Sequence, residues 1–497
     1  MKTTTDVDRE LVFRAYPELR GRQRAVMRAR LRQLEREHSH PEQERAERGS
    51  RRRRRQADLG DLPYMARGRW GRLGQSLWGP VGAMVPMHVT STADVGVLTP
   101  FTSLPAHLLD GPAIGLQTFD QGVFRFDPWA AYRAKLVTSP GLCAWGTMGS
   151  GKTYAMQTAA LRLVRYGRHV IVEEDPKGDW VKLAQAVGGQ VVQIGPGCQS
   201  PTNPLAAPTL RAGADELAAR RQVDAHRARL LRQMVLVLRD GKPFTEGEEP
   251  CLDAVVEAMR HGTCRASIPG VVQYLADAPQ ELRALVGQDS VTAMHLVLRR
   301  LVSGPLAGMV DTDAEVELDP ASPMIVFDTS SMLGADEVTK GIANACLSAR
   351  VDSLLQCGDG RFRIVIDEEA WAKLRNPYAA QAIDNRLRMT GHWRCSPWLI
   401  FHELNDIQQM ADLGAHREVV RGIVSKSQIK VVFRQSPAAL EMYRDFVQPS
   451  EREMEIVRSL PARVGLWRLG ERFAVTVQAA TVASSHALFD NDEGRAG

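Results

Sequence analysis

The stretch Gly146–Thr153, GTMGSGKT, fits the pattern G-x-x-x-x-G-K-[ST] at every fixed position. An apolar run, GLCAW at residues 141–145, precedes it, and a helix-forming run, TYAMQTAALRLVRYG, continues from it over residues 153–167. A strand that leads into a glycine-rich turn, followed at once by a helix, is the context in which this pattern binds phosphate. The stretch therefore predicts an α/β fold with a phosphate-binding loop.

The residue types of the loop explain this chemistry. Glycines let the backbone curl so that successive N–H groups point at phosphate oxygens, and the following helix adds the positive end of its dipole. Lys152 would reach the β- and γ-phosphates, and Thr153 would bind Mg²⁺. We therefore expect ATP and Mg²⁺ as cofactors, with the nucleotide held by Gly146, Thr147, Met148, Gly149, Ser150, Gly151, Lys152, Thr153 and Tyr154.

A second part of the site is expected where an apolar run meets acidic residues, in RIVIDEEAW at residues 363–371. Asp367 is predicted to end a buried strand and to hold Mg²⁺ through water. Glu368 is predicted to orient or deprotonate the attacking water. Glu369 is an alternative for that role, because the sequence does not determine the register of the three acids.

Composition places the chain among globular proteins, since 44% of its residues are hydrophobic and 24% are charged. None of the seven cysteines forms a C-x-x-C pair, so neither a zinc site nor a disulfide framework is indicated, and a reducing compartment fits best. We find no secretory signal and no run of about 18 apolar residues, so we expect a cytoplasmic protein without a membrane span.

Positive charge is concentrated near the N-terminus. Residues 1–75 carry 20 lysines and arginines against 11 acidic residues, although the whole chain has a net charge of only +5. Arg51–Arg55 form an unbroken arginine run. Such runs are usually solvated and disordered, but this one could also contact nucleic-acid phosphates or an anionic membrane surface.

Strand-like and helix-like runs alternate after the loop, which favours a mainly parallel sheet covered by helices. The strand-like runs are HVIVEED (169–175), QVVQIG (190–195), PMIVFD (323–328), FRIVID (362–367), PWLIFH (397–402) and IKVVFR (429–434). We predict six segments along the chain: a basic, partly disordered arm (1–60), a small β-containing lead-in (61–135), the first part of the nucleotide-binding domain (136–209), a helical insertion (210–320), the second part of that domain (321–480) and a disordered tail (481–497).

Three further stretches occur in order with the two phosphate-site motifs: EEDPKGDW at 173–180, GPGCQSPTNPL at 195–205 and GPLAGMVD at 304–311. In this order the chain resembles, over about residues 100–475, the conjugative type IV secretion ATPases of the VirB-four class, within the HerA–FtsK superfamily of P-loop ATPases. Those of mobile elements in high-GC bacteria are the most similar. The Asp-Pro-Lys-Gly stretch and the Asn203-Pro204 step are more specific than the phosphate loop.

The resemblance implies a RecA-like motor with an inserted all-helical subdomain, in a ring-forming homo-oligomer, a hexamer, whose active sites lie between subunits. Its implied partners are components of type IV secretion or conjugation, DNA, and the inner face of the cell membrane through the basic arm. An arginine should act in trans on the transition-state charge. Arg388 is the predicted residue, and the alternatives are Arg386, Arg394 and Arg434.

The chain departs from the family pattern in two places. The strand after the catalytic one usually ends in a glutamine, and His402 stands here instead; we predict it to be catalytic, or else to mark a weak hydrolase. Fewer residues precede position 100 than the family's large N-terminal domain contains, so the basic arm is expected to take over docking.

Three functions follow as hypotheses. The first is an ATP-hydrolysing motor that energises conjugative DNA transfer or type IV secretion. The second is a DNA translocase or coupling protein of the FtsK-like type. The third is a nucleotide-binding scaffold of a secretion complex that hydrolyses ATP only weakly.

Overall fold

The structure of the chain is a computed structural model. It describes residues 109–119, 122–195, 203–208, 210, 213, 215–303, 307–312, 316–374, 377–401, 415–471, 473–480 and 488–489. All of these belong to the second of the two units into which the chain divides, residues 91–497. The predicted basic arm, His402 and most of the predicted tail lie outside the described residues.

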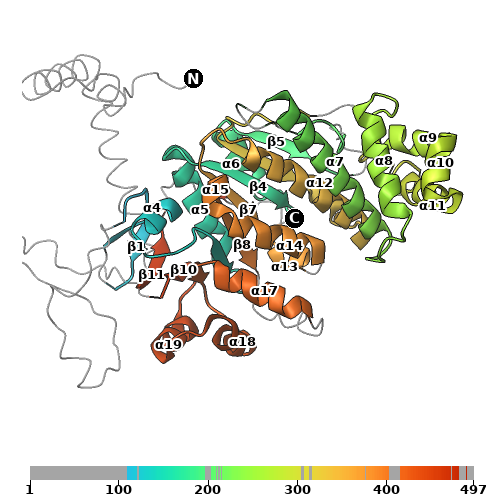
Figure 1. Cartoon of the computed structure of the whole chain (residues 1–497). Helices are drawn as coiled ribbons and strands as arrows, with labels where there is room; N and C mark the ends of the chain where they lie inside the picture. Colours follow the sequence, from blue (N-terminus) through green and yellow to red (C-terminus); the bar gives the residue numbers. More distant parts are fainter. Residues whose placement is uncertain are drawn as a thin grey trace, which may run out of the picture. The chain divides into compact units, whose positions relative to one another are not determined.

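The described strands form one eleven-stranded sheet with the order β2-β1-β11-β10-β9-β3-β8-β7-β4-β6-β5 (Figure 1). Their bounds are β1 Ala113–Gln117, β2 Val123–Arg125, β3 Leu142–Trp145, β4 His169–Asp175, β5 Gln190–Gln193, β6 Met324–Asp328, β7 Arg363–Asp367, β8 Cys395–Phe401, β9 Ile429–Val432, β10 Val464–Leu469 and β11 Phe473–Ala479. From β9 to β5 all neighbours are parallel, which confirms the predicted mainly parallel α/β fold.

Helices cover both faces of this sheet. The described helices are α4 Pro128–Arg133, α5 Lys152–Arg165, α6 Val181–Ala186, α7 Glu216–Leu238, α8 Glu248–Arg260, α9 Ile268–Ala276, α10 Gln280–Val286, α11 Gln288–Arg299, the 3-10 turn η4 Ser330–Met332, α12 Glu337–Gln356, α13 Ala370–Leu374, α14 Pro377–Arg388, α15 Thr390–Trp393, α17 Ala415–Lys426, α18 Pro437–Val447 and α19 Glu451–Ser459. One face packs against α4, α5 and α6. The other packs against α7 and α12 on one half, and against α14, α17 and α18 on the other half.

The pleat of each strand decides which core its side chains join. In β3, Leu142 and Ala144 pack on the side of α5, whereas Cys143 and Trp145 pack on the opposite side. In β7, Ile364 and Ile366 lie on the α5 side. Successive side chains of a strand point to opposite faces, and here both faces are buried. β3 and the middle of β7 are therefore apolar, without the alternation of polar residues that would mark a solvent-facing side.

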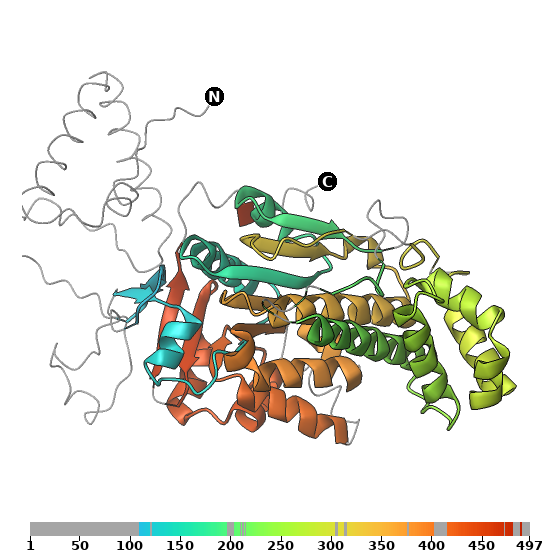
Figure 2. The ribbon, with the colours of Figure 1, turned by 45° about the horizontal axis from the view of Figure 1, so that its top comes forward.

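The segment 216–299 is helical and shares its core with the sheet. Side chains of α7, including Leu230, Leu231 and Met234, belong to the same buried cluster as α12 and β6. Helices α7 and α12 lie side by side, and α8–α11 stand beyond one end of the sheet rather than over it (Figures 1 and 2). Because one continuous core joins the two parts, the helical segment is built on α7 and α12 instead of being a separate globule.

Antiparallel strands extend the sheet beyond β9, and neither β10 nor β11 was predicted from the sequence. β10 pairs with β9 and β11, and β1 pairs with β11. Gly115 of β1 is required by this contact, since a Cβ there would come within 2.1 Å of the Gln478 carbonyl oxygen. The described part of the predicted lead-in therefore belongs to the main sheet.

The six described cysteines are all buried and form no disulfide. Within the described residues, no helix has both the length and the apolar character that a membrane crossing requires.

Candidate active site

The loop between β3 and α5 has the curled backbone that its glycines permit. Gly149 and Gly151 have φ angles of +74° and +89°, a region that side chains other than glycine rarely adopt. Gly151 also meets another backbone closely, because a Cβ there would lie 2.8 Å from the Arg463 Cα. These two glycines are thus needed for the shape of the loop.

The loop closes on itself through the lysine. Lys152 is only 4% exposed, and its Nζ donates a hydrogen bond of 3.1 Å to the Gly146 carbonyl oxygen. Ser150 Oγ is buried and has no hydrogen-bond partner among the described residues. A buried hydroxyl without a partner carries an energetic cost of about 1–3 kcal/mol, so it marks a place for an additional polar group.

Other loop residues are placed at the rim. Thr147 donates from its backbone N–H and its Oγ1 to the Arg434 carbonyl oxygen, at 3.2 and 3.3 Å. Met148 is 79% exposed. The Tyr154 ring packs edge-on against Phe489, with centroids 5.6 Å apart. The loop is therefore attached to the end of β9, and the Tyr154 ring contacts another side chain of the same chain.

Glu368 comes to the loop from a distant part of the sequence. Thr153 Oγ1 donates to Glu368 Oε1 at 3.1 Å, and the Trp180 indole Nε1 donates to Glu368 Oε2 at 3.1 Å. Burial raises the pKa of Glu368, an effect that the Trp180 hydrogen bond and the Lys152 charge oppose. The structure thus joins the phosphate-binding loop to an acid that directly follows β7.

The structure places Asp367, the predicted Mg²⁺ ligand, away from the loop. Asp367 is 1% exposed, and its carboxylate pairs with the Lys373 ammonium rather than with the loop. The physical reason is the pleat: residues 364, 366 and 368 face α5, so residue 367 faces the other side. Glu368, not Asp367, is the acid at Thr153.

The Asp367 side of the sheet holds a buried network of charges. Lys373 Nζ lies 3.1 Å from Glu173, and Arg386 Nε lies 2.7 Å from Asp352 Oδ1. Arg386 also pairs with Glu173 and is 1% exposed. Although burial acts in the opposite direction, Arg386 and Lys373 lower the pKa of Glu173 to about 2. Because its guanidinium is committed to this network, Arg386 does not meet the expectation of an arginine that acts in trans.

Glu369 is held differently from both of its neighbours. Its φ angle of +57° is in the left-handed region, which is unusual for a glutamate, and its carboxylate pairs with the Lys177 ammonium. Such backbone conformations cost about 1–3 kcal/mol and concentrate at functional sites. Glu369 therefore stands out as a second acid beside Glu368.

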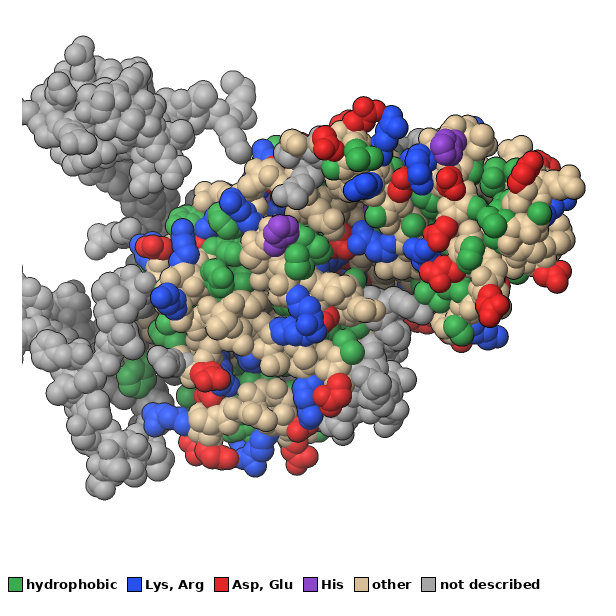
Figure 3. Space-filling view, in the orientation of Figure 1, with side chains coloured by type: hydrophobic (Ala, Val, Ile, Leu, Met, Phe, Trp, Pro, Cys, Tyr) green, Lys and Arg blue, Asp and Glu red, His purple; other side chains and the backbone are tan. Residues whose placement is uncertain are grey.

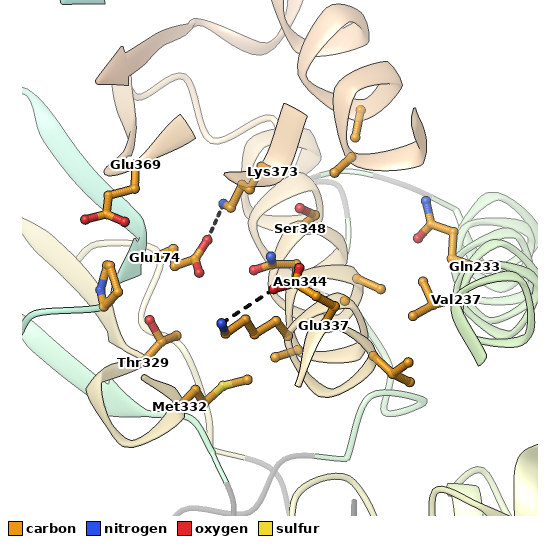
Figure 4. A pocket seen from close by; sticks show the side chains of 18 of the residues that line it. Glu174, Gln233, Val237, Thr329, Met332, Glu337, Asn344, Ser348, Glu369 and Lys373 are labelled. Atoms are coloured by element: carbon orange, nitrogen blue, oxygen red, sulfur yellow. Dashed lines mark ion pairs between the residues drawn. The ribbon is translucent and has the colours of Figure 1, made fainter. Parts of the chain in front are cut away.

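A cavity of about 580 Å³ lies on the Asp367 side, between α7, α12 and the ends of β4 and β6 (Figure 4). Glu174, Thr329, Glu369 and Lys373 are among its lining residues. Burial raises the pKa of Glu174 to about 7. No residue of the loop lines this cavity, but Glu369 borders it.

The arginines predicted to act in trans are widely separated. Arg388 ends α14, pairs with Asp384 at 2.7 Å and has a 61% exposed side chain. Its neighbour Leu387 packs against Gly141, which directly precedes β3. Arg388 therefore lies near the amino-terminal ends of the strands, whereas the loop of the same chain lies at their carboxyl-terminal ends. Arg434, by contrast, lies at the loop itself.

Two residues near the loop were not assigned a role by sequence reasoning. Trp180 is part of the quoted EEDPKGDW stretch, yet nothing local indicated that its indole reaches Glu368. Arg463 donates its backbone N–H to the Ser150 carbonyl oxygen at 2.8 Å, and its guanidinium lies 5.6 Å from the centre of the Tyr154 ring. No motif surrounds Arg463, so only the pairing of β10 could have found it.

The residues present fit a Mg²⁺-bound nucleotide. Glycines at the points of close approach, the buried Ser150 hydroxyl and the paired Thr153 and Glu368 supply a cradle for phosphate with one hydroxyl and one carboxylate. Mg²⁺ at phosphate sites commonly uses one or two protein oxygens together with phosphate and water. The described residues contain no cluster of three or more His, Cys, Asp or Glu side chains that could hold a metal ion.

The fold and the loop define the class: an α/β P-loop NTPase fold of the RecA-like type. Among solved structures, VirB4 of Thermoanaerobacter pseudethanolicus matches with a TM-score of 0.57 and 19% identity, over 76% of this chain and 98% of that one. The plasmid coupling protein TrwB, in complex with a non-hydrolysable ATP analogue, matches with a TM-score of 0.52 and 14% identity, over 76% of this chain and 91% of that one. No protein-family model matches the sequence, and no curated protein does either.

Proposed function

We propose that the chain is an ATP-hydrolysing motor that energises conjugative DNA transfer or type IV secretion. The observation that carries this proposal is the contact of Thr153 with Glu368, which unites the phosphate-binding loop and the acidic strand end in one site. The similarity in fold to VirB4 and to TrwB, over 76% of the chain, supports the assignment of this motor to conjugation or type IV secretion.

The loop residues divide the work of binding. Backbone N–H groups of residues 146–153 and the start of α5 would hold the phosphates, and Lys152 would neutralise their charge. Thr153 and Glu368 would hold Mg²⁺, with Glu368 acting through water. When bound, Mg²⁺ supplies positive charge that offsets the charge developing on the transferred phosphoryl group.

Glu369 would orient or deprotonate the attacking water. It directly follows Glu368, its backbone is in a strained conformation, and it is 21% exposed, so its carboxylate is accessible. This is the alternative left open by the sequence: the Mg²⁺ role moves from Asp367 to Glu368, and the role of acting on water moves from Glu368 to Glu369. His402 retains its proposed catalytic role at the end of β8, outside the described residues.

A ring-forming homo-oligomer, a hexamer, is part of the proposal. The exposed side chain of Arg388 would serve the site of a neighbouring subunit, with Arg434 as the alternative. The complex would work at the inner face of the cell membrane with components of type IV secretion or conjugation, and the basic arm would meet the membrane surface or DNA.

The test compares nucleotide binding and ATP hydrolysis in the wild type, in Lys152→Ala and in a control, Lys242→Ala, whose side chain is exposed in the helical segment. Lys152→Ala is expected to lose at least about a hundredfold in turnover, because the phosphate charge is no longer offset. The control should match the wild type. Equal and substantial hydrolysis by all three proteins would overturn the proposal. Nucleotide binding without turnover by the wild type would favour the scaffold hypothesis.

A second function, a DNA translocase or coupling protein, is favoured by the match to TrwB and by the basic residues of the N-terminal segment. On the face in Figure 3, described basic side chains are interspersed with acidic ones. Residues 1–75, with 20 lysines and arginines against 11 acidic residues, are therefore the DNA contact of this second hypothesis. Addition of duplex DNA should then raise the ATPase rate, and the increase should fall steeply with salt. Loss of this stimulation on removal of residues 1–75 would assign the contact to the arm.

A further inference from the structure

We propose that the turn Asp175–Trp180 is a positioning device for the two acids after β7, with Trp180 fixing Glu368 and Lys177 fixing Glu369. This inference rests on the proposed function, because it concerns how that hydrolytic site is aligned. Neither residue is placed in contact with nucleotide. Both would act through the carboxylates that they hold.

The Glu368 carboxylate receives a donor on each oxygen. Thr153 occupies Oε1 and the Trp180 indole occupies Oε2, both at 3.1 Å. Trp180 is 0% exposed, and its indole N–H can only donate. Two donors from different elements determine the plane of the carboxylate, so Glu368 cannot rotate without breaking one of them. The tryptophan is thus suited to hold the orientation of Glu368 when the Thr153 hydroxyl leaves this hydrogen bond to bind Mg²⁺.

The turn is itself fixed to two elements. Asp175 Oδ1 accepts from the Asp179 backbone N–H at 3.0 Å, and its Oδ2 accepts from the Trp180 backbone N–H at 2.8 Å. Gln157 of α5 donates to the Asp179 carbonyl oxygen at 2.8 Å. Gly178, with φ of +70°, allows the chain to reverse. The indole is therefore anchored to the end of β4 and to the helix that begins the nucleotide site.

The same turn reaches the second acid. Lys177 and Glu369 form an ion pair, with side chains that are 31% and 21% exposed. Glu368 and Glu369 are consecutive, and each is held by a different side chain of one short turn. The pleat places Glu368 on the side of Thr153, Trp180 holds it there, and Lys177 holds Glu369.

The experiment compares Trp180→Phe, which keeps an aromatic ring but removes the donor, with Trp129→Phe. Trp129 is also buried, at 5% exposure, and its indole N–H has no hydrogen-bond partner among the described residues. Steady-state ATP hydrolysis is measured over a range of ATP concentrations in the wild type and in both variants. Loss of a hydrogen bond to a charged group should reduce kcat by about tenfold to a hundredfold in Trp180→Phe. The KM for ATP should change much less.

The split between kcat and KM separates positioning from simple destabilisation. Without the indole donor the Glu368 carboxylate loses one of the two contacts that fix its plane, so the loss should fall on kcat and not on ATP binding. Trp129→Phe should leave both kcat and KM unchanged. Identical kcat for the two variants would overturn the inference. A wild type that neither binds nor hydrolyses ATP would instead refute the proposed function.

A surface variant keeps the test decisive if Trp180→Phe does not fold. Lys177→Met removes only a partly exposed ammonium group, and it should lower kcat severalfold with no change in the unfolding transition. Lys177→Arg should restore most of the loss, because a guanidinium can still pair with Glu369. Wild-type turnover in Lys177→Met would show that the turn does not position the second acid.

Discussion

Asp367 and Glu368 are adjacent carboxylates of similar chemistry, but they lie on opposite sides of the sheet and have different partners. On the α5 side, Glu368 accepts hydrogen bonds from neutral donors, Thr153 and Trp180. On the other side, Asp367 belongs to a network of full charges with Lys373 and Glu173. The Glu368 carboxylate has no cationic side chain as its hydrogen-bond donor, whereas the negative charge of Asp367 is already paired with Lys373.

The difference shows how one strand can serve a site and a scaffold at once. The charge network joins β4, β7, α12, α13 and α14, so it holds together the elements that surround the strand end. Buried ion pairs are weak evidence of net stabilisation, but the loss of one partner leaves an uncompensated charge. We expect variants on the two sides to separate stability from turnover.

The largest effect is expected on the network side, at Arg386. Arg386→Met would leave Glu173 and Asp352 buried without their main partner, so the free energy of unfolding should fall by about 3–5 kcal/mol. Arg388→Met is the matched control two residues along the same helix, and its exposed pair should be worth at most about 1 kcal/mol. Urea unfolding of both variants measures the difference. Similar midpoints for the two would contradict the distinction between the sides.

The next largest effect is expected when the two neighbouring acids, Glu368 and Asp367, are replaced one at a time. Glu368→Gln should reduce turnover by about a hundredfold to a thousandfold with little change in stability, because Mg²⁺ loses its carboxylate. Asp367→Asn should do the reverse: turnover stays near that of the wild type, and the unfolding midpoint falls, because Lys373 loses a partner. Parallel ATPase assays and urea titrations suffice. If Asp367→Asn instead abolishes turnover, Asp367 holds Mg²⁺ and Glu368 acts on the water, as predicted from the sequence.

The smallest effect concerns pH and Glu174, at the cavity on the network side. Its pKa is raised by burial to about 7, so the folded state holds a proton that the unfolded state releases above about pH 4.5. Stability from this group is therefore lost as pH rises from about 4.5 to 7. Glu174→Gln should be more stable than the wild type at pH 8, by on the order of 1–3 kcal/mol, with the advantage vanishing near pH 5.

The control for this prediction is Glu337→Gln at the rim of the same cavity. The Glu337 side chain is 86% exposed, so its replacement should give the same small difference in stability at every pH. Unfolding is followed by urea titration at pH 5, 6, 7 and 8. An advantage of Glu174→Gln that does not depend on pH would mean that the buried carboxyl is ionised throughout.

The sequence alone was sufficient for the fold class and for the parallel strands, but not for β10 and β11. The strands β3 to β9 were predicted from apolar runs, and the loop and α5 from a glycine pattern with its helical continuation. These features are local: a run of apolar residues forms a buried strand, and a glycine accepts a positive φ, whatever the rest of the chain does. The motif order also pointed to the fold that the comparisons confirm.

Only the tertiary structure decided which acid meets the loop, which arginine is buried, and that Trp180 reaches Glu368. In the middle of a strand that is buried on both faces, as at 364–366 of β7, every residue is apolar, so the sequence carries no record of which side faces α5. That direction follows from pairing between strands and packing of helices hundreds of residues apart. The local pattern therefore supplied the groups, and the non-local packing determined their roles.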